Sequence, residues 1–227
     1  MYIPRKIIAC VMIVLLLAAG FLPAATATAA SASLTTIFSQ DNGFYGNMFD
    51  VEVLSSSDVS ITAFDVNIQT GITTVYVYYR EGSYVGYETN SSAWTLAGSA
   101  AVSGMGENNP THFTIDDIRL TAGNTYGFYI TANPATGIEI KYTDGTGSYA
   151  DANLKITCGA GLGYLFAGST IHQDRIWNGT IYYTFSPVTI PQTGDPAGHA
   201  LWQYLAVAAI AGSLVLLCLK RRARHAG

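Results

Sequence analysis

Basic residues are scarce in this chain, and most of them lie near its ends. Of the 11 Lys and Arg residues, six fall within residues 1–6 and 220–227, whereas the 15 Asp and Glu residues are spread along the sequence. Residues 31–193 hold fourteen acidic residues against five basic ones, a net charge of −9. A surface with that balance repels polyanions, so nucleic acids are not expected among the partners of this protein.

Cysteine is almost absent as well. Of the three cysteines, Cys10 and Cys218 lie in long apolar runs at the two ends, which leaves Cys158 alone in the central part of the chain. One thiol cannot form an internal disulfide, so the central part must be stabilised by its hydrophobic core. We expect Cys158 to behave as a small buried apolar residue.

Helical periodicity is lacking between the two apolar ends, and alternation with a period of two residues takes its place. Phe49, Val51 and Val53, for example, alternate with two acidic residues. Strands of this kind are predicted at 49–53, 64–68, 73–80, 94–102, 111–115, 125–131, 138–142, 154–158 and 176–185. Turn-forming residues separate them, and we interpret the glycine-rich Gly159–Gly163 as a loop. Short strands with one apolar and one polar face predict an all-β fold, an antiparallel β-sandwich that is jelly-roll-like or Ig-like.

The first 30 residues have the organisation of a secretory signal peptide. Arg5 and Lys6 precede an apolar stretch at 7–19, and small residues follow at 24–30. That order of charge, apolar core and small residues is the one that signal peptidases process, and we expect cleavage within Ala27–Ala32.

The last 38 residues contain three features in a fixed order. The pentapeptide Ile190-Pro-Gln-Thr-Gly194 comes first, an apolar run at 200–219 follows, and a basic tail at 220–227 closes the sequence. Twenty apolar residues in a helix extend about 30 Å, which is enough to cross the hydrocarbon core of a bilayer. The cationic tail is expected to stay on the cytoplasmic side.

This order resembles the cell-wall sorting signal of Gram-positive surface proteins of the LPxTG type, with Ile190 where leucine is commonest. The resemblance implies that a sortase is a partner: its cysteine thiolate attacks the carbonyl of Thr193, Gly194 leaves, and an amine of the peptidoglycan precursor resolves the acyl-enzyme. It also implies covalent attachment to peptidoglycan through Thr193, on the extracellular side in the cell wall, with membrane insertion only before sorting. The implied sorting residues are Ile190, Pro191, Gln192, Thr193 and Gly194. The alternative is a plain C-terminal membrane anchor.

Several phrases of the central part, such as Gly46–Asp50, Leu120–Ile130 and Arg175–Tyr183, resemble a domain found in secreted and surface proteins of many bacteria. The resemblance extends over about residues 43–185 and implies a β-sandwich, with no assigned activity and no site residues. The whole sequence therefore divides into a signal peptide at 1–30, an extracellular β-sandwich domain at 31–186, a short linker at 187–199 with the sorting motif at 190–194, a transmembrane segment at 200–219 and a basic cytoplasmic tail at 220–227.

No catalytic or zinc motif is found. There is no Gly-x-Ser-x-Gly sequence, and His112 and His172 are the only histidines of residues 31–193, without the clustered spacing of metal ligands. Calcium is the metal for which the sequence offers the most ligands, because pairs of acidic residues flank glycine-rich turns. Ordinary hairpin turns, with no metal, explain the same pattern. These acids are Asp41, Asp50, Asp144 and Asp151. We expect no enzyme activity and no required cofactor.

Tyrosines that alternate with apolar residues in the predicted strands are the strongest indication of a ligand-binding site in this sequence. Tyr76 and Tyr78 have the outward parity of their strand, and Tyr129 and Tyr182 likewise alternate with apolar residues. Exposed tyrosines with a tryptophan nearby can stack against sugar rings. The candidate ligand face consists of Tyr76, Tyr78, Tyr129, Tyr182, Trp94 and Trp177. The alternative is that these tyrosines are ordinary strand residues, half-buried beneath loops or the other sheet.

The sequence thus predicts a cell-wall-anchored surface protein with a non-catalytic binding or adhesion module for a glycan, a wall polymer or another surface protein. A structural coat protein is one alternative. A wall- or glycan-acting hydrolase is another, and it would need two carboxylates held about 5–10 Å apart in a cleft.

Overall fold

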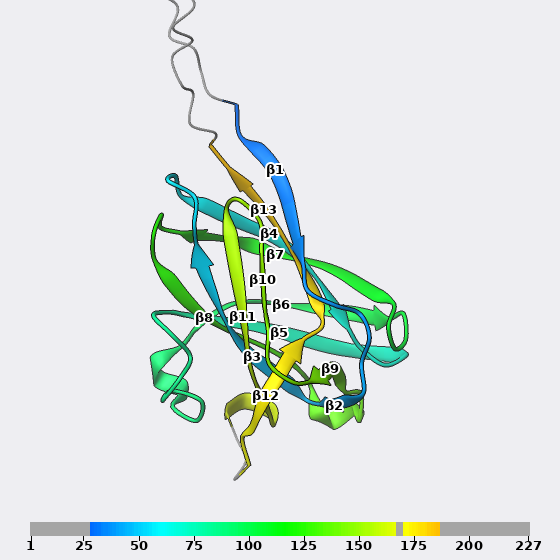
Figure 1. Cartoon of the computed structure of the whole chain (residues 1–227). Helices are drawn as coiled ribbons and strands as arrows, with labels where there is room; N and C mark the ends of the chain where they lie inside the picture. The colour runs from blue at the N-terminus through cyan, green and yellow to red at the C-terminus, as the bar shows by residue number, and fades with distance from the viewer. Residues whose placement is uncertain (1–27, 167–169, 187–227) are drawn as a thin grey trace, which may run out of the picture. The chain divides into compact units, whose positions relative to one another are not determined.

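A computed structural model of the chain describes residues 28–166 and 170–186 (Figure 1). The sorting motif, the apolar run at 200–219 and nearly all of the predicted signal peptide lie outside these described residues. Two antiparallel sheets pack face to face, so the predicted all-β sandwich is confirmed. Among the described residues, no helix is long and apolar enough to cross a membrane.

Short strands account for nearly all of the regular structure. The strands are β1 (Ala30–Thr35), β2 (Asn42–Phe44), β3 (Gly46–Val53), β4 (Val59–Asn67), β5 (Gly71–Glu81), β6 (Thr95–Gly104), β7 (Pro110–Leu120), β8 (Thr125–Ala132), β9 (Ile140–Asp144), β10 (Ser148–Ala150), β11 (Leu154–Leu162), β12 (His172–Trp177) and β13 (Gly179–Phe185). Three single-turn 3₁₀-helices join some of them: η1 (Ser91–Ala93), η2 (Pro134–Thr136) and η3 (Tyr164–Phe166).

The strands form a small sheet and a large sheet. The four-stranded sheet has the order β1-β13-β4-β7. The nine-stranded sheet has the order β2-β9-β12-β11-β3-β8-β5-β6, with β10 paired to β11. Most neighbours are distant in sequence, as in the pairing of β3 with β11, and such an order cannot be read from strand periodicity alone.

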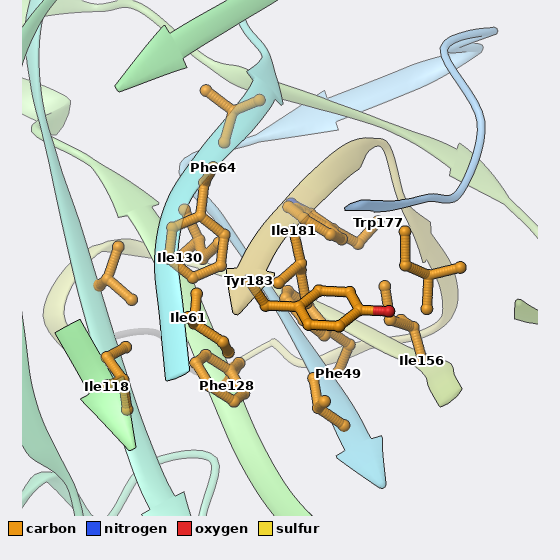
Figure 2. Close-up of a cluster of buried hydrophobic side chains, with 14 of the residues drawn as sticks. Phe49, Ile61, Phe64, Ile118, Phe128, Ile130, Ile156, Trp177, Ile181 and Tyr183 are labelled. Atoms are coloured by element: carbon orange, nitrogen blue, oxygen red, sulfur yellow. The ribbon is translucent and has the colours of Figure 1, made fainter. Parts of the chain in front are cut away.

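The inward faces of the two sheets form the main core. Phe49 of β3 stacks against Trp177 of β12 with ring centroids 4.3 Å apart and against Phe128 of β8 at 5.8 Å, while Phe64 of β4 approaches from the other sheet (Figure 2). Each aromatic ring of this size removes about 150–250 Å² from water, so rings dominate the burial. The described residues of the two hydrophobic clusters, with the partly buried residues packed against them, lie between positions 32 and 166 or 171 and 185. Residues 28–186, called the sandwich domain below, therefore contain every group of the core.

The predicted strand at 176–185 is two strands in different sheets. β12 ends in the large sheet at Trp177, β13 begins in the four-stranded sheet at Gly179, and the buried Asn178 alone makes the crossing. The Asn178 amide donates a 3.0 Å hydrogen bond to the Thr143 hydroxyl. A Cβ on Gly179 would lie 2.1 Å from the Trp177 ring, so only glycine lets the chain turn so closely over the indole.

The glycine-rich Gly159–Gly163 is not a loop, as the sequence suggested, because β11 continues through it to Leu162. A Cβ at Gly159 would lie 2.5 Å from the backbone oxygen of Met48 and 2.7 Å from the Tyr84 ring. A Cβ at Gly161 would lie about 3.0 Å from Tyr142. Gly159 and Gly161 belong to a strand against which backbone and aromatic rings pack closely. Such close approach is a common reason for glycine within a sheet.

The two ends of the sandwich domain lie at one pole. β1 and β13 are antiparallel, and Ala30 at the start of the first pairs with Phe185 at the end of the second (Figure 1). We call this end the terminal pole. The opposite end, the far pole, is made by the connections after β1, β4, β6 and β8, around Asn67 and Pro110.

Candidate functional site

The six residues of the predicted ligand face lie in three separate places. Tyr76, Tyr78, Tyr129 and Trp94 are on or beside the outer face of the large sheet, Trp177 is in the core between the sheets, and Tyr182 is on the outer face of the four-stranded sheet. The structure therefore does not bring them together as one open face.

Tyr129 has the outward parity that its sequence predicts, yet its exposure is 0% because other residues cover it. Phe166 lies 4.9 Å from its ring and Trp94 lies 6.3 Å from it, and Tyr78 stacks on it at 6.1 Å. With Met48 and neighbouring apolar residues they form a second, smaller core on the outer face of the large sheet. The prediction that Tyr129 and Trp94 are open to a ligand is wrong, since both are buried.

The connection from Gly82 to Trp94 forms the cover of this second core. Asp50 accepts hydrogen bonds from the Ser83 hydroxyl (2.6 Å) and the Tyr84 backbone N–H (2.9 Å), which holds the start of the connection on the sheet. Burial raises the pKa of Asp50, although these hydrogen bonds and nearby Arg80 oppose the shift. Arg80 in turn lies 3.7 Å over the Tyr87 ring. These contacts make the cover a built part of the domain.

Trp177 cannot contribute to any surface. Its exposure is 0%, with Phe49 stacked on one side and Phe64 at its edge. The prediction that Trp177 lies beside an exposed tyrosine face is therefore wrong. Of the predicted ligand face, Tyr76 is the residue on the outer face of the large sheet that is half-exposed and lies outside the second core. It pairs with Ser99 of the edge strand β6.

Tyr182 belongs to a polar lattice on the outer face of the four-stranded sheet. Strand register sets Thr35, Thr180, Asp65 and His112 in one row across the sheet, and Ser33, Tyr182, Ala63 and Thr114 in the next row. The members at the edges of these rows, on β1 and β7, are exposed, and Tyr182 is half-exposed, whereas Ala63, Asp65 and Thr180 between them are buried. This sheet thus presents an open, hydroxyl-rich face, in contrast to the covered aromatic patch of the large sheet.

Asp65 organises the centre of this face. One of its carboxylate oxygens lies 2.8 Å from His112 Nδ1, and the other accepts a 2.8 Å hydrogen bond from the Tyr182 hydroxyl. The Asp65 side chain is only 8% exposed, while that of His112 is 55% exposed. The hydrogen bond to Asp65 is the first cause that raises the pKa of Tyr182, so the phenol keeps its proton and remains a donor. The two rings meet edge to face, with centroids 5.2 Å apart.

Nothing in the spacing of His112 links it to Asp65. Asp65 and His112 each have the outward parity of their strand. Their strands, β4 and β7, are neighbours in the four-stranded sheet, but β5 and β6, which lie between them in the sequence, belong to the large sheet. Only the β4–β7 register places Asp65 opposite His112, so no signal in the sequence would have paired them.

A hollow of about 440 Å³ opens at the far pole, lined by Gln69, Thr70, Gly106, Glu107, Gly137 and Ile138. Lys141 Nζ lies 2.9 Å from Glu139 and 3.4 Å from Glu107 beside it. Burial lowers the pKa of Lys141, but these two carboxylates outweigh burial and hold it above its usual value. The ammonium group of Lys141 is therefore paired with both carboxylates.

The acids proposed for calcium make other contacts. Asp41 accepts from the Asp144 backbone N–H (2.7 Å), Asp144 pairs with Arg175 at 3.0 Å, and Asp151 accepts from the backbone N–H groups of Asn153 and Leu154. Asp50 holds Ser83 and Tyr84 as described above. In the part of the chain that the structure describes, no group of three or more His, Cys, Asp or Glu residues is placed to hold a metal ion.

The predicted sorting residues, Ile190 to Gly194, lie outside the described residues. No protein-family model matches this chain, and a comparison with curated proteins finds no match.

Cys158 gives a first testable prediction. It is half-buried against the main core as a free thiol, and burial raises its pKa to about 11. An unfolded thiol has a pKa of about 8.5, so near pH 8 the folded state should hold on the order of 100-fold less reactive thiolate. We expect Ellman's reagent to label the native sandwich domain that much more slowly than the urea-unfolded chain. Equal labelling rates, or a melting temperature that falls on adding reductant, would contradict this description of Cys158.

Proposed function

We propose that this protein is a cell-wall-anchored, non-catalytic binding module on the extracellular side of a Gram-positive bacterium. Its precursor would carry a signal peptide at 1–30 and a transmembrane segment at 200–219. A sortase would then join Thr193 to peptidoglycan. The scaffold would be the jelly-roll-like or Ig-like sandwich that the sequence predicts.

The placement of the chain ends is the observation that supports this proposal most directly. Ala30 pairs with Phe185 at the terminal pole, so a tether after Phe185 leaves from the same end as the processed N-terminus. The hollow at the far pole lies at the opposite end of the sandwich domain from Phe185. A protein held by one end with its surfaces free suits binding.

The short tether narrows the class of partner. Only a few residues separate Phe185 from Ile190, and at about 3.3–3.6 Å per residue they reach at most about 20 Å. A domain held so closely would work within or just above the wall, where glycans, wall polymers and neighbouring surface proteins are at hand. A structural coat protein remains the second candidate, and it predicts no ligand for either surface.

Anchoring is tested by replacing Thr193 and Gly194 together with alanine. The variant keeps the backbone carbonyl at position 193 but loses the threonine side chain and the glycine that define the motif, so a sortase no longer has its recognition sequence. We therefore expect the variant to remain in the membrane fraction, while wild type is released only by muralytic digestion. Gln192→Ala is the matched control, because the third position of an LPxTG-type motif is variable, and it should sort normally. If all three proteins partition alike, the wall-anchoring proposal fails.

A further inference from the structure

His112 carries a hydrogen-bond acceptor that its neighbours hold in place. A carboxylate oxygen has only lone pairs to offer, so in the neutral imidazole the Nδ1 that meets Asp65 at 2.8 Å must carry the proton. The other ring nitrogen, Nε2, then has a free lone pair. Since the side chain is 55% exposed on an open sheet face, this lone pair is available to a ligand.

Tyr182 is held by the same carboxylate. Its hydroxyl donates to Asp65, which fixes the phenol ring edge to face with His112 at 5.2 Å. The ring is half-exposed, so part of its apolar surface faces solvent beside the imidazole. An apolar ring surface and a fixed acceptor therefore lie next to each other. The exposed Ser33 lies opposite Tyr182 on β1, and the exposed Thr114 lies two residues along β7 from His112.

We propose that this cluster is a glycan-binding site. The Tyr182 ring would stack against the apolar face of a sugar, and His112 Nε2 would accept a hydrogen bond from one of its hydroxyls. Asp65 acts as a positioning residue that fixes both partners in advance, which reduces the entropy lost on binding. The inference rests on the proposed binding function and adds to it a ligand class and a set of residues.

The negative net charge of the domain favours a neutral glycan over an anionic wall polymer as the ligand. Residues 31–193 carry a net charge of −9, which repels polyol-phosphate chains. A lone pair on Nε2 likewise suits a hydroxyl or amide donor and not a phosphate oxygen, which has no proton to give. A neutral oligosaccharide of N-acetylglucosamine is therefore the probe of choice, with a polyol-phosphate polymer as the anionic comparison.

Paired variants separate the two functional groups from a purely structural network. His112→Asn keeps a donor near Nδ1 and removes the Nε2 acceptor, whereas His112→Gln keeps a polar group near the Nε2 position. Tyr182→Ala removes the ring, whereas Tyr182→Phe removes only the hydroxyl. Tyr76→Ala, a half-exposed tyrosine on the other sheet, is the matched control.

The experiment is a titration of the sandwich domain with the neutral oligosaccharide by calorimetry, with thermal melting of each variant measured in parallel. We expect His112→Asn to weaken binding about 5- to 10-fold, the effect of one lost hydrogen bond, and His112→Gln to weaken it less. Tyr182→Ala should weaken binding about 10-fold and Tyr182→Phe about 2-fold, because stacking is retained in the latter. Tyr76→Ala should leave binding unchanged.

Three results would overturn the inference: no binding of the neutral probe by wild type, Tyr182→Ala binding as well as wild type, or losses of affinity that follow the melting temperature and not the group removed. Preferential binding of the polyol-phosphate polymer would overturn the choice of ligand class. Failure of the glycan site and failure of the proposed function can be told apart. The fractionation test measures only anchoring, and a wall-anchored module that binds a protein and not a glycan would still agree with the proposed function.

Discussion

Replacing Trp177 with alanine is expected to lower the free energy of unfolding of the sandwich domain by about 3–5 kcal/mol. The indole is fully buried, stacked on Phe49 at 4.3 Å and in edge contact with Phe64 of the other sheet. Its removal leaves a cavity where the two sheets meet and where the chain crosses between them. Domains of this size are stable by about 5–15 kcal/mol, so the loss is a large share of the total.

Urea unfolding followed by tyrosine fluorescence and circular dichroism measures this loss in both proteins. Trp94→Ala is the comparison, since Trp94 is at 9% exposure in the smaller second core and its indole N–H donates a 2.9 Å hydrogen bond to the Tyr87 carbonyl. We expect a smaller loss for Trp94→Ala than for Trp177→Ala. If Trp177→Ala unfolds at the urea concentration of wild type, Trp177 is not the core residue described above.

Replacing Gly159 with valine is expected to destabilise the domain by about 3 kcal/mol, at the upper end of the usual cost of overpacking. The new Cβ would lie 2.5 Å from the Met48 carbonyl oxygen and 2.7 Å from the Tyr84 ring, so either β3 or the cover that carries Tyr84 must move. Because the cover shields Tyr129, its displacement should also change the near-ultraviolet circular dichroism of the aromatic cluster.

Gly147→Val is the matched control for this prediction. A Cβ at Gly147 would meet its nearest neighbours at 3.6 Å or more, which is ordinary contact, and we expect a change within about 0.5 kcal/mol. If Gly159→Val is as mild as Gly147→Val, the glycine-rich segment is better described as the loop that its sequence suggests than as the end of β11.

The burial of the two tryptophans and of Tyr129 shows where sequence patterns stop being informative. Alternation within a strand assigned Tyr129 to the outer face of its sheet, and it lies there. Whether an outer face meets solvent depends on what the connecting segments do, and here Gly82–Trp94 and η3 fold over it. Burial of that kind is a property of the loops, which carry no periodicity.

The break at Asn178 shows a related limit. Ten consecutive residues, 176–185, have good strand character, and nothing in the alternation marks the residue at which the chain leaves one sheet for the other. The buried amide of Asn178 and the missing side chain of Gly179 explain the crossing once the indole beneath them is known. The position of the Trp177 indole is known only from the tertiary structure, so the crossing at Asn178 could not be predicted from the sequence.

The sequence by itself determined the class of fold and the absence of disulfides within the domain, because these depend on period-two alternation and on the number of cysteines. It also predicts the processing of the two chain ends from the order of charged and apolar segments. Only the tertiary structure decided which polar residues meet. Asp65, His112 and Tyr182 come from β4, β7 and β13, and only strand register across the four-stranded sheet brings the Asp65 carboxylate within 2.8 Å of both His112 Nδ1 and the Tyr182 hydroxyl. Register is set by packing over the whole core, so a candidate site built across three strands is not encoded in any one segment of the chain.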